Sequence, residues 1–227
     1  MRAMILAAGR GERMRPLTDT CPKPLLPVGG KPLIVWHLER LAAAGFREVV
    51  INHAHLGAQI EAALGNGSAW GLHLAYSPEP PGALETAGGI VQALSLLGEE
   101  PFLVINGDVY CDWDVGRAPA LTLGEDQAHL VLVPNPPQHP EGDFALADGR
   151  VTDAGTPRHT FAGIGLYRPA LFAGLVAGQP AKLAPLLRQA MARGLVGGEL
   201  YRGRWEDVGT PARLQALDAE LGGAARV

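Results

Sequence analysis

The strongest constraint on the fold is the alternation of short apolar runs with helical stretches over the first hundred residues. We expect strands at Ala3–Ala7, Glu48–Asn52, Leu72–Tyr76 and Phe102–Asn106, and helices at Pro32–Ala44, Gly57–Leu64 and Thr86–Leu97. Strands that alternate with helices are typical of βαβ units. The first half therefore predicts a mostly parallel sheet with helices on both faces.

The second half is less regular and contains more proline-rich and glycine-rich loops. We expect short strands at His129–Val133, Phe144–Leu146, Arg150–Thr152 and Phe161–Tyr167, a helix at Lys182–Arg193, a strand near Glu199–Arg202, and a last helix capped by Thr210 and ended by Gly222. The short strands predict a small antiparallel annex. The sequence thus indicates a Rossmann-like α/β fold with a mostly parallel mixed sheet, and 227 residues are typical of a single domain.

Composition excludes several classes of partner. A formal net charge of −4 without any run of Lys or Arg argues against nucleic acid and anionic membranes. The apolar start of the chain is broken at Gly9, so it is neither a signal peptide nor a membrane span. Cys21 and Cys111 lie far apart without metal-ligand spacing, which fits a reducing compartment. We expect a soluble cytoplasmic protein.

The first predicted strand runs into a loop suited to polyphosphate, within the segment LAAGRGERMRP at residues 6–16. Gly9 and Gly11 allow the backbone to approach a phosphate closely. Arg13, Arg15 and Lys23 supply the positive charge that a triphosphate requires. Loops at the carboxyl ends of parallel strands are where open α/β sheets bind ligands. A surface turn with solvated arginines is the alternative.

Two common phosphate motifs do not match this chain. A Walker A loop ends in Gly-Lys-Ser/Thr, whereas Gly30-Lys31 is followed by Pro32. A dinucleotide fingerprint has a third glycine three residues after Gly11, where this chain has Met14. The second mismatch argues against a nicotinamide-dependent oxidoreductase.

Two acidic segments are candidates for a metal site. Asp108 follows the apolar strand Phe102–Asn106, and Asp207 follows Trp205 and Glu206 just before the last helix. Magnesium that also holds phosphate oxygens needs only one or two protein carboxylates. Strand alternation puts Glu206 and Asp207 on opposite faces but leaves open which of them faces the ligand. Simple turns are the alternative at both places.

A pair of histidines, His53 and His55, raises the question of zinc. No cysteine or third ligand lies at a suitable spacing from them. We expect them to finish the second strand instead of binding metal.

Together these motifs resemble the sugar-phosphate nucleotidyltransferase family. The resemblance is carried in order by the segment at 6–16 with Pro22-Lys23-Pro24, then Glu85–Gly89, Asn106–Asp108 and Trp205–Thr210, so it spans nearly the whole chain. Within the family, the chain most resembles short bacterial uridylyltransferases that recycle cell-wall sugar, through the segments 50–54, 76–79, 142–144, 182–191 and 201–203.

The resemblance implies transfer of a nucleotide from a nucleoside triphosphate to a sugar 1-phosphate, with Mg²⁺ as cofactor and release of pyrophosphate. It implies a nucleotide-binding half at residues 1–110 and a sugar-binding half at residues 111–227. Nucleotide contacts would come from Gly9, Gly11, Glu12, Arg13, Lys23, Glu79 and Gly88, the catalytic groups would be Arg15, Lys23 and Asp108, the sugar phosphate would meet Asn106 and Asp143, and the metal would bind Asp108 and Asp207.

The chain departs from larger members of the family in two ways. They carry a Glu-Lys-Pro segment whose lysine touches the sugar phosphate, and no such lysine lies near Thr152–Pro157, so Lys182 is a possible substitute. We expect no C-terminal repeat domain and, for that reason, a monomer. A guanylyltransferase for mannose 1-phosphate, a cytidylyltransferase for a small phosphorylated alcohol and a non-catalytic nucleotide-sugar sensor are the alternative functions.

Overall fold

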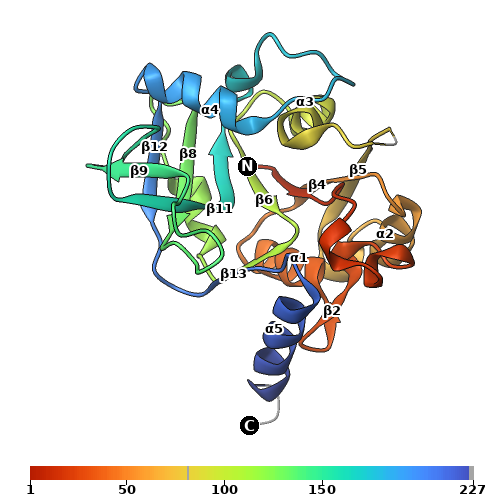
Figure 1. Cartoon of the computed structure of the whole chain (residues 1–227). Coiled ribbons are helices and arrows are strands. Elements are labelled where there is room, and N and C mark those ends of the chain that lie inside the picture. Colours follow the sequence, from red (N-terminus) through yellow and green to blue (C-terminus); the bar gives the residue numbers. More distant parts are fainter. Residues whose placement is uncertain (81, 225–227) are drawn as a thin grey trace.

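A nine-stranded mixed sheet is the centre of the computed structural model, which describes residues 1–80 and 82–224 (Figure 1). Its strands are β1 (Ala3–Leu6), β4 (Glu48–His53), β5 (His73–Pro78), β6 (Phe102–Asn106), β8 (Ala128–Val133), β9 (Phe144–Ala147), β10 (Arg150–Thr152), β11 (Arg158–Tyr167) and β12 (Val196–Leu200). They lie in the order β5-β4-β1-β6-β11-β8-β12-β10-β9. The predicted α/β class with a mixed sheet is confirmed.

The parallel part of the sheet contains all four strands predicted for the first half. β4 and β6 both pair in parallel with β1, and β5 pairs in parallel with β4. The chain moves outward from β1 to β5 and then returns to β6 on the other side of β1. Such a reversal opens a ligand crevice at the carboxyl ends of the strands.

Helices cover both faces of the sheet, as predicted. α1 (Leu33–Ala43) and α2 (Gly57–Leu64) pack on one face, and α3 (Glu85–Leu97) and α4 (Leu183–Ala192) on the other. The alternation of side chains along β1 explains this, because Ile5 joins the cluster beneath α1 while Met4 joins the cluster beneath α3. Both side chains are fully buried.

The antiparallel strands of the second half continue the same sheet. β11 runs antiparallel to both β6 and β8, and β9 pairs with β10 and with the start of β11. β12 is parallel to β8 and begins three residues before the strand predicted near Glu199. These pairings curl the far side of the sheet back on itself.

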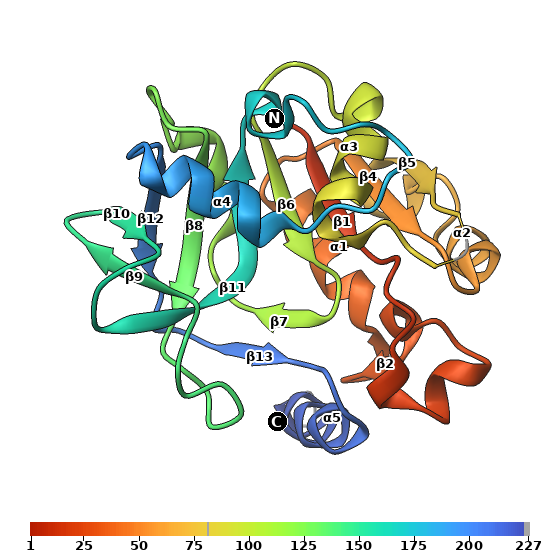
Figure 2. The ribbon, with the colours of Figure 1, turned by 45° about the horizontal axis from the view of Figure 1, so that its top comes forward.

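Two short ribbons lie outside the nine-stranded sheet; a short strand that ends at Glu206 and Asp207 was expected, but neither pairing was predicted. β2 (Pro27–Val28) pairs with β3 (Lys31–Pro32), and β7 (Val109–Cys111) pairs with β13 (Trp205–Asp207). Short 3₁₀ helices complete the elements: η1 (Glu12–Met14), η2 (Leu17–Asp19), η3 (Lys23–Leu25), η4 (Ser68–Trp70), η5 (Val115–Ala120) and η6 (Pro169–Phe172). Figure 2 shows β13 running beside β7 and leading into the last helix, α5 (Pro211–Ala224).

α5 ties the end of the chain to its beginning. Its Leu214 and Leu217 are buried in a third apolar cluster with Met14 and Val28. Thr210 Oγ1 accepts a hydrogen bond from Arg213 N at 3.4 Å, which confirms the predicted cap. The prediction that Gly222 ends the helix is wrong, because Gly222 keeps a helical conformation and a glycine stops a helix only by turning left-handed.

No helix within residues 1–80 and 82–224 is long and apolar enough to cross a membrane.

Candidate functional site

Two adjoining cavities lie at the carboxyl ends of the parallel strands. The first, of about 340 Å³, is lined by the ends of β1, β4 and β6, by Lys23 and by residues of the segment 79–86. The second, of about 200 Å³, lies between the β7–β13 ribbon, β11 and the loop 134–143. Asn106 and Asp108 line both cavities. A ligand in one cavity therefore meets a ligand in the other beside these two side chains.

The glycine-containing loop after β1 forms part of the wall of the first cavity. Gly9 and Lys23 line it, and Lys23 is only 8% exposed. Gly11 has a φ of 71°, a conformation that favours glycine, and its carbonyl accepts a hydrogen bond from Thr18 Oγ1 at 2.8 Å. The loop is therefore folded back on η2, with a buried ammonium group beside the cavity.

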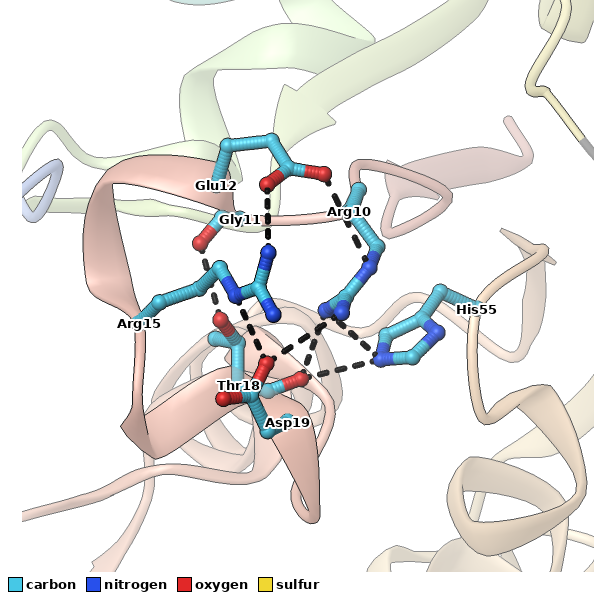
Figure 3. A network of polar contacts seen from close by, with 7 residues as sticks. All are labelled: Arg10, Gly11, Glu12, Arg15, Thr18, Asp19 and His55. Carbon is cyan, nitrogen blue, oxygen red and sulfur yellow. Dashed lines mark hydrogen bonds and ion pairs between the residues drawn. The ribbon is translucent and has the colours of Figure 1, made fainter.

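The arginines of this loop take part in a polar network outside the cavities (Figure 3). Arg15 Nε donates to Asp19 Oδ1 at 2.8 Å, and its guanidinium also lies 3.7 Å from Glu12. Arg10 donates to Thr18 O at 2.7 Å and to Asp19 Oδ1 at 3.3 Å. Arg15 and Glu12 thus face each other and solvent in this structure.

The other predicted loop cation, Arg13, lies elsewhere. Its guanidinium lies beside Gly209, on the loop that precedes α5. It lines neither cavity. Among the predicted phosphate-binding cations, Lys23 is the one that the structure places in the wall.

Glu79 is held rigidly in the wall of the first cavity. Its Oε1 accepts from Asn52 Nδ2 at 2.6 Å, and its Oε2 accepts from Leu84 N at 2.7 Å. Asn52 is oriented in turn, because its Oδ1 accepts from Ala7 N at 2.8 Å. Asn52 is only 3% exposed and was not predicted as a site residue. Its position near the end of β4, where ligands bind in such sheets, is the sequence feature that could have indicated it.

Gly89, and not the predicted Gly88, packs against this pair. A side chain at Gly89 would collide with Glu79 Oε1 and lie 2.8 Å from Asn52 Nδ2, whereas Gly88 faces the backbone of residues 179–181. We expect Gly89→Ala to displace Glu79, raise the KM for the nucleotide and lower the free energy of unfolding by about 1–3 kcal/mol. Denaturant unfolding and initial-rate assays measure the two effects.

The matched control for this variant is Gly222→Ala in α5. An added Cβ at Gly222 meets nothing within 4 Å. We expect it to stabilise the helix by about 0.5–1 kcal/mol. Equal behaviour of the two variants would contradict a close contact at Gly89.

The two predicted metal carboxylates lie at the same end of the β7–β13 ribbon, Asp108 in the turn just before β7 and Asp207 as the last residue of β13. β7 and β13 pair so that Asp207 stands opposite Val109, and Val208 N donates to Asp108 O at 2.9 Å. Trp205 and Asp207 line the second cavity and Glu206 does not. Of the two neighbouring acidic residues, Asp207 is therefore the one on the cavity side of β13. Each carboxylate also has a cationic partner.

Two ion pairs involve the carboxylates that line the second cavity. Lys23 Nζ donates to Asp108 Oδ2 at 2.6 Å, and Arg213 Nη1 donates to Asp207 Oδ2 at 2.7 Å. Behind them, burial and the nearby Arg40 lower the pKa of His37 to about 4, which outweighs the opposing effects of a Val109 hydrogen bond and Asp108. His37 is therefore neutral at pH 7, and the charged groups here are the two ion pairs.

The sugar side of the site was only partly predicted. Asn106 occupies a space opened by Gly163, at a β-bulge in β11, where a Cβ would lie 2.6 Å from Asn106 Nδ2. Asp143 does not line the second cavity; it supports His139, which does, with Asp143 Oδ1 lying 3.1 Å from His139 Nε2. Lys182 is exposed before α4 and lines neither cavity.

The histidine pair after β4 has partners of its own. His53 Nε2 lies 2.7 Å from Glu61 Oε1, and His55 Nε2 lies 2.9 Å from Thr18 O. Over the part of the chain that the structure describes, no group of three or more His, Cys, Asp or Glu side chains is placed to hold a metal ion.

Comparison with known proteins assigns the chain to a family. The family model described as nucleotidyl transferase matches residues 2–150. An N-acetylmuramate alpha-1-phosphate uridylyltransferase of Neisseria meningitidis serogroup B is 60% identical, with 98% of this chain and 99% of that protein covered. A protein with the same name from Caulobacter vibrioides is 38% identical, with 96% of each covered.

A solved structure supports the fold. The chain superposes on a putative glucose-1-phosphate thymidylyltransferase from Bacillus anthracis with a TM-score of 0.84 and 24% identity, covering 98% of this chain and 95% of that one. The matched family model, the two relatives covered nearly end to end and the cavities at the carboxyl ends of the parallel strands agree. The chain belongs to the nucleotidyl transferase family.

Proposed function

We propose that this protein transfers a uridylyl group from UTP to N-acetylmuramic acid α-1-phosphate, which gives UDP-N-acetylmuramic acid and pyrophosphate. The observation that carries the proposal is the meeting of two cavities at Asp108, with Lys23 against that carboxylate. A transferase of this kind brings two anionic substrates together at one phosphorus atom. The relative that is 60% identical over nearly the whole chain supports the choice of substrates.

Each cavity would bind one of the two substrates. Residues 1–110 would form the nucleotide-binding half, with the base near Glu79 and the triphosphate along Gly9, Gly11 and Lys23. Residues 111–227 would form most of the sugar-binding half, with Asn106 between them. For Arg15 to reach the triphosphate, its pair with Asp19 in Figure 3 would have to open when nucleotide binds. Glu12 would have to leave Arg10 and Arg15, and Arg13 would have to leave Gly209. Gly88 would affect nucleotide binding only indirectly, by letting α3 pack closely against residues 179–181 and so positioning Gly89.

The reaction would be a direct in-line displacement. An oxygen of the sugar phosphate attacks the α-phosphorus of UTP, the bond from that phosphorus to the bridging oxygen breaks, and pyrophosphate leaves. The attacking oxygen is already an anion at neutral pH, so no general base is required. Lys23, in the wall of the first cavity, would neutralise charge on the α-phosphoryl group, and the cavity walls would hold the reactants in line.

Enzymes of this family use a divalent metal, and we propose Mg²⁺ here. The donor set fits, because Asp108 and Asp207 present carboxylate oxygens to one cavity and Mg²⁺ takes its other ligands from water and phosphate. Each carboxylate has one oxygen engaged by a cation and a second oxygen available. When bound, the ion would offset negative charge on the phosphates.

We further propose that the protein acts in the cytoplasm as a monomer, with small molecules as its only partners. The alternative functions are another sugar-1-phosphate nucleotidyltransferase and a non-catalytic sensor. A sensor has no need of two carboxylates facing the same cavity, which argues against it.

The test is pyrophosphate release with Mg²⁺ from UTP, GTP, CTP, ATP and dTTP, each paired with the 1-phosphates of N-acetylmuramic acid, N-acetylglucosamine, glucose and mannose. We expect the highest kcat/KM for UTP with the muramic sugar. A different best pair would keep the chemistry and replace the substrates, and no release from any pair would favour the sensor.

A further inference from the structure

The second cavity has an uneven distribution of charge. Asp108, in the turn before β7, and Asp207, at the end of β13, supply two carboxylates to one wall. Among the described residues that line this cavity, His139 is the one side chain that can carry positive charge. It comes from a different wall, the loop 134–143 between β8 and β9, which Figure 2 shows beside β13. Since both carboxylates already have cationic partners, an anionic substituent of the sugar would be attracted to the wall that carries His139.

The loop that carries His139 is braced from within. Asn135 Nδ2 donates to Pro140 O at 2.9 Å and to Arg158 O at 3.0 Å. Asn135 Oδ1 also accepts from Thr160 Oγ1 at 2.9 Å. These bonds tie the beginning of the loop to its middle and to the start of β11, so the backbone that carries His139 is held in place before ligand binds.

The imidazole itself is oriented by Asp143. His139 Nε2 lies 3.1 Å from Asp143 Oδ1, while Asp143 Oδ2 accepts from Phe161 N at 2.8 Å. An ionised carboxylate only accepts hydrogen bonds, so Nε2 carries a proton and Nδ1 is left for a ligand. The same pair explains how Asp143, which does not line the cavity, would influence sugar binding.

Resting on the proposed function, we propose that His139 recognises the lactyl carboxylate of N-acetylmuramic acid α-1-phosphate. The imidazolium would donate from Nδ1 to that carboxylate and from Nε2 to Asp143. N-acetylglucosamine 1-phosphate has a hydroxyl at the same ring position and lacks this anion. His139 is thereby a specificity-determining residue that separates two sugars alike in their phosphate and acetamido groups.

The test compares His139→Gln with the unaltered enzyme on both sugar 1-phosphates at saturating UTP. We expect kcat/KM for the muramic sugar to fall by about 10- to 100-fold, mainly through KM, because one charge-assisted hydrogen bond is lost. The value for N-acetylglucosamine 1-phosphate should change less than threefold. If that sugar is not turned over, its inhibition constant against the muramic sugar replaces kcat/KM.

Two further variants separate recognition from a structural role. His139→Lys restores a cation and should recover part of the muramic preference. Glu141→Gln alters an exposed residue of the same loop and should change neither sugar. Equal losses on both sugars in His139→Gln, or no loss on either, would overturn the inference. Absence of turnover of the muramic sugar by the unaltered enzyme would instead overturn the proposed function.

Discussion

Asp108→Asn is expected to lower kcat on the order of 10³-fold at saturating Mg²⁺ while leaving the fold intact. Asp108 lines both cavities and contacts Lys23 at 2.6 Å, so its charge acts at the point where the two substrates meet. Asparagine keeps an oxygen that accepts from Lys23 but removes the negative charge that a cation requires. The Asp108 side chain is 38% exposed, but its partner Lys23 is buried, so we expect the free energy of unfolding to fall by about 1–3 kcal/mol while the protein remains folded.

The matched control is Asp148→Asn. Asp148 is exposed and lines neither cavity. Asp148 has a φ of 49°, which asparagine tolerates as well as aspartate does. Steady-state turnover across a Mg²⁺ titration and denaturant unfolding should be measured for both variants. Near-normal turnover of Asp108→Asn at saturating Mg²⁺ would exclude Asp108 as a metal ligand.

Lys23→Met is expected to lower kcat/KM for UTP by about 10²- to 10³-fold, since it removes the one predicted loop cation that lines the first cavity. Methionine fills a similar volume, and Asp108 keeps access to water, so the protein should remain folded. Combining Lys23→Met with Asp108→Asn should cost less than the product of the two single losses, because both act on the same phosphoryl group.

Lys182→Met is the matched control for Lys23→Met. It removes the same charge from an exposed position that lines neither cavity, and we expect less than a twofold change in kcat/KM for either substrate. A large rise in the KM for the sugar phosphate would show instead that Lys182 replaces the lysine missing near Thr152–Pro157.

Much of the fold could be predicted from local patterns. The apolar runs of β1, β4 and β6 and the spacing of buried residues in α1 and α3 are periodic signals, and the structure confirms them. The β7–β13 ribbon has no such signal, because each strand is three residues long and its partner is about a hundred residues away. Only the tertiary fold determines this pairing, and it is what brings Asp207 beside Asp108.

The candidate site divides in the same way. Lys23, Glu79 and Asp108 follow recognisable strand ends or loop motifs and lie in the wall of the first cavity. Asn52 and His139 were missed because their roles depend on partners distant in sequence, Glu79 for the first and the cavity beside β13 for the second. Sequence patterns do not show that Arg15 pairs with Asp19 either, because this contact depends on the side-chain conformations of both residues.

The central claim is tested most directly by incubating the protein with UTP, N-acetylmuramic acid α-1-phosphate and Mg²⁺ and measuring both products over time. We predict that UDP-N-acetylmuramic acid, identified by mass, and pyrophosphate form in equal amounts, and that Asp108→Asn forms almost none of either. Pyrophosphate without the nucleotide sugar, or neither product under conditions where the protein is folded, would contradict the claim.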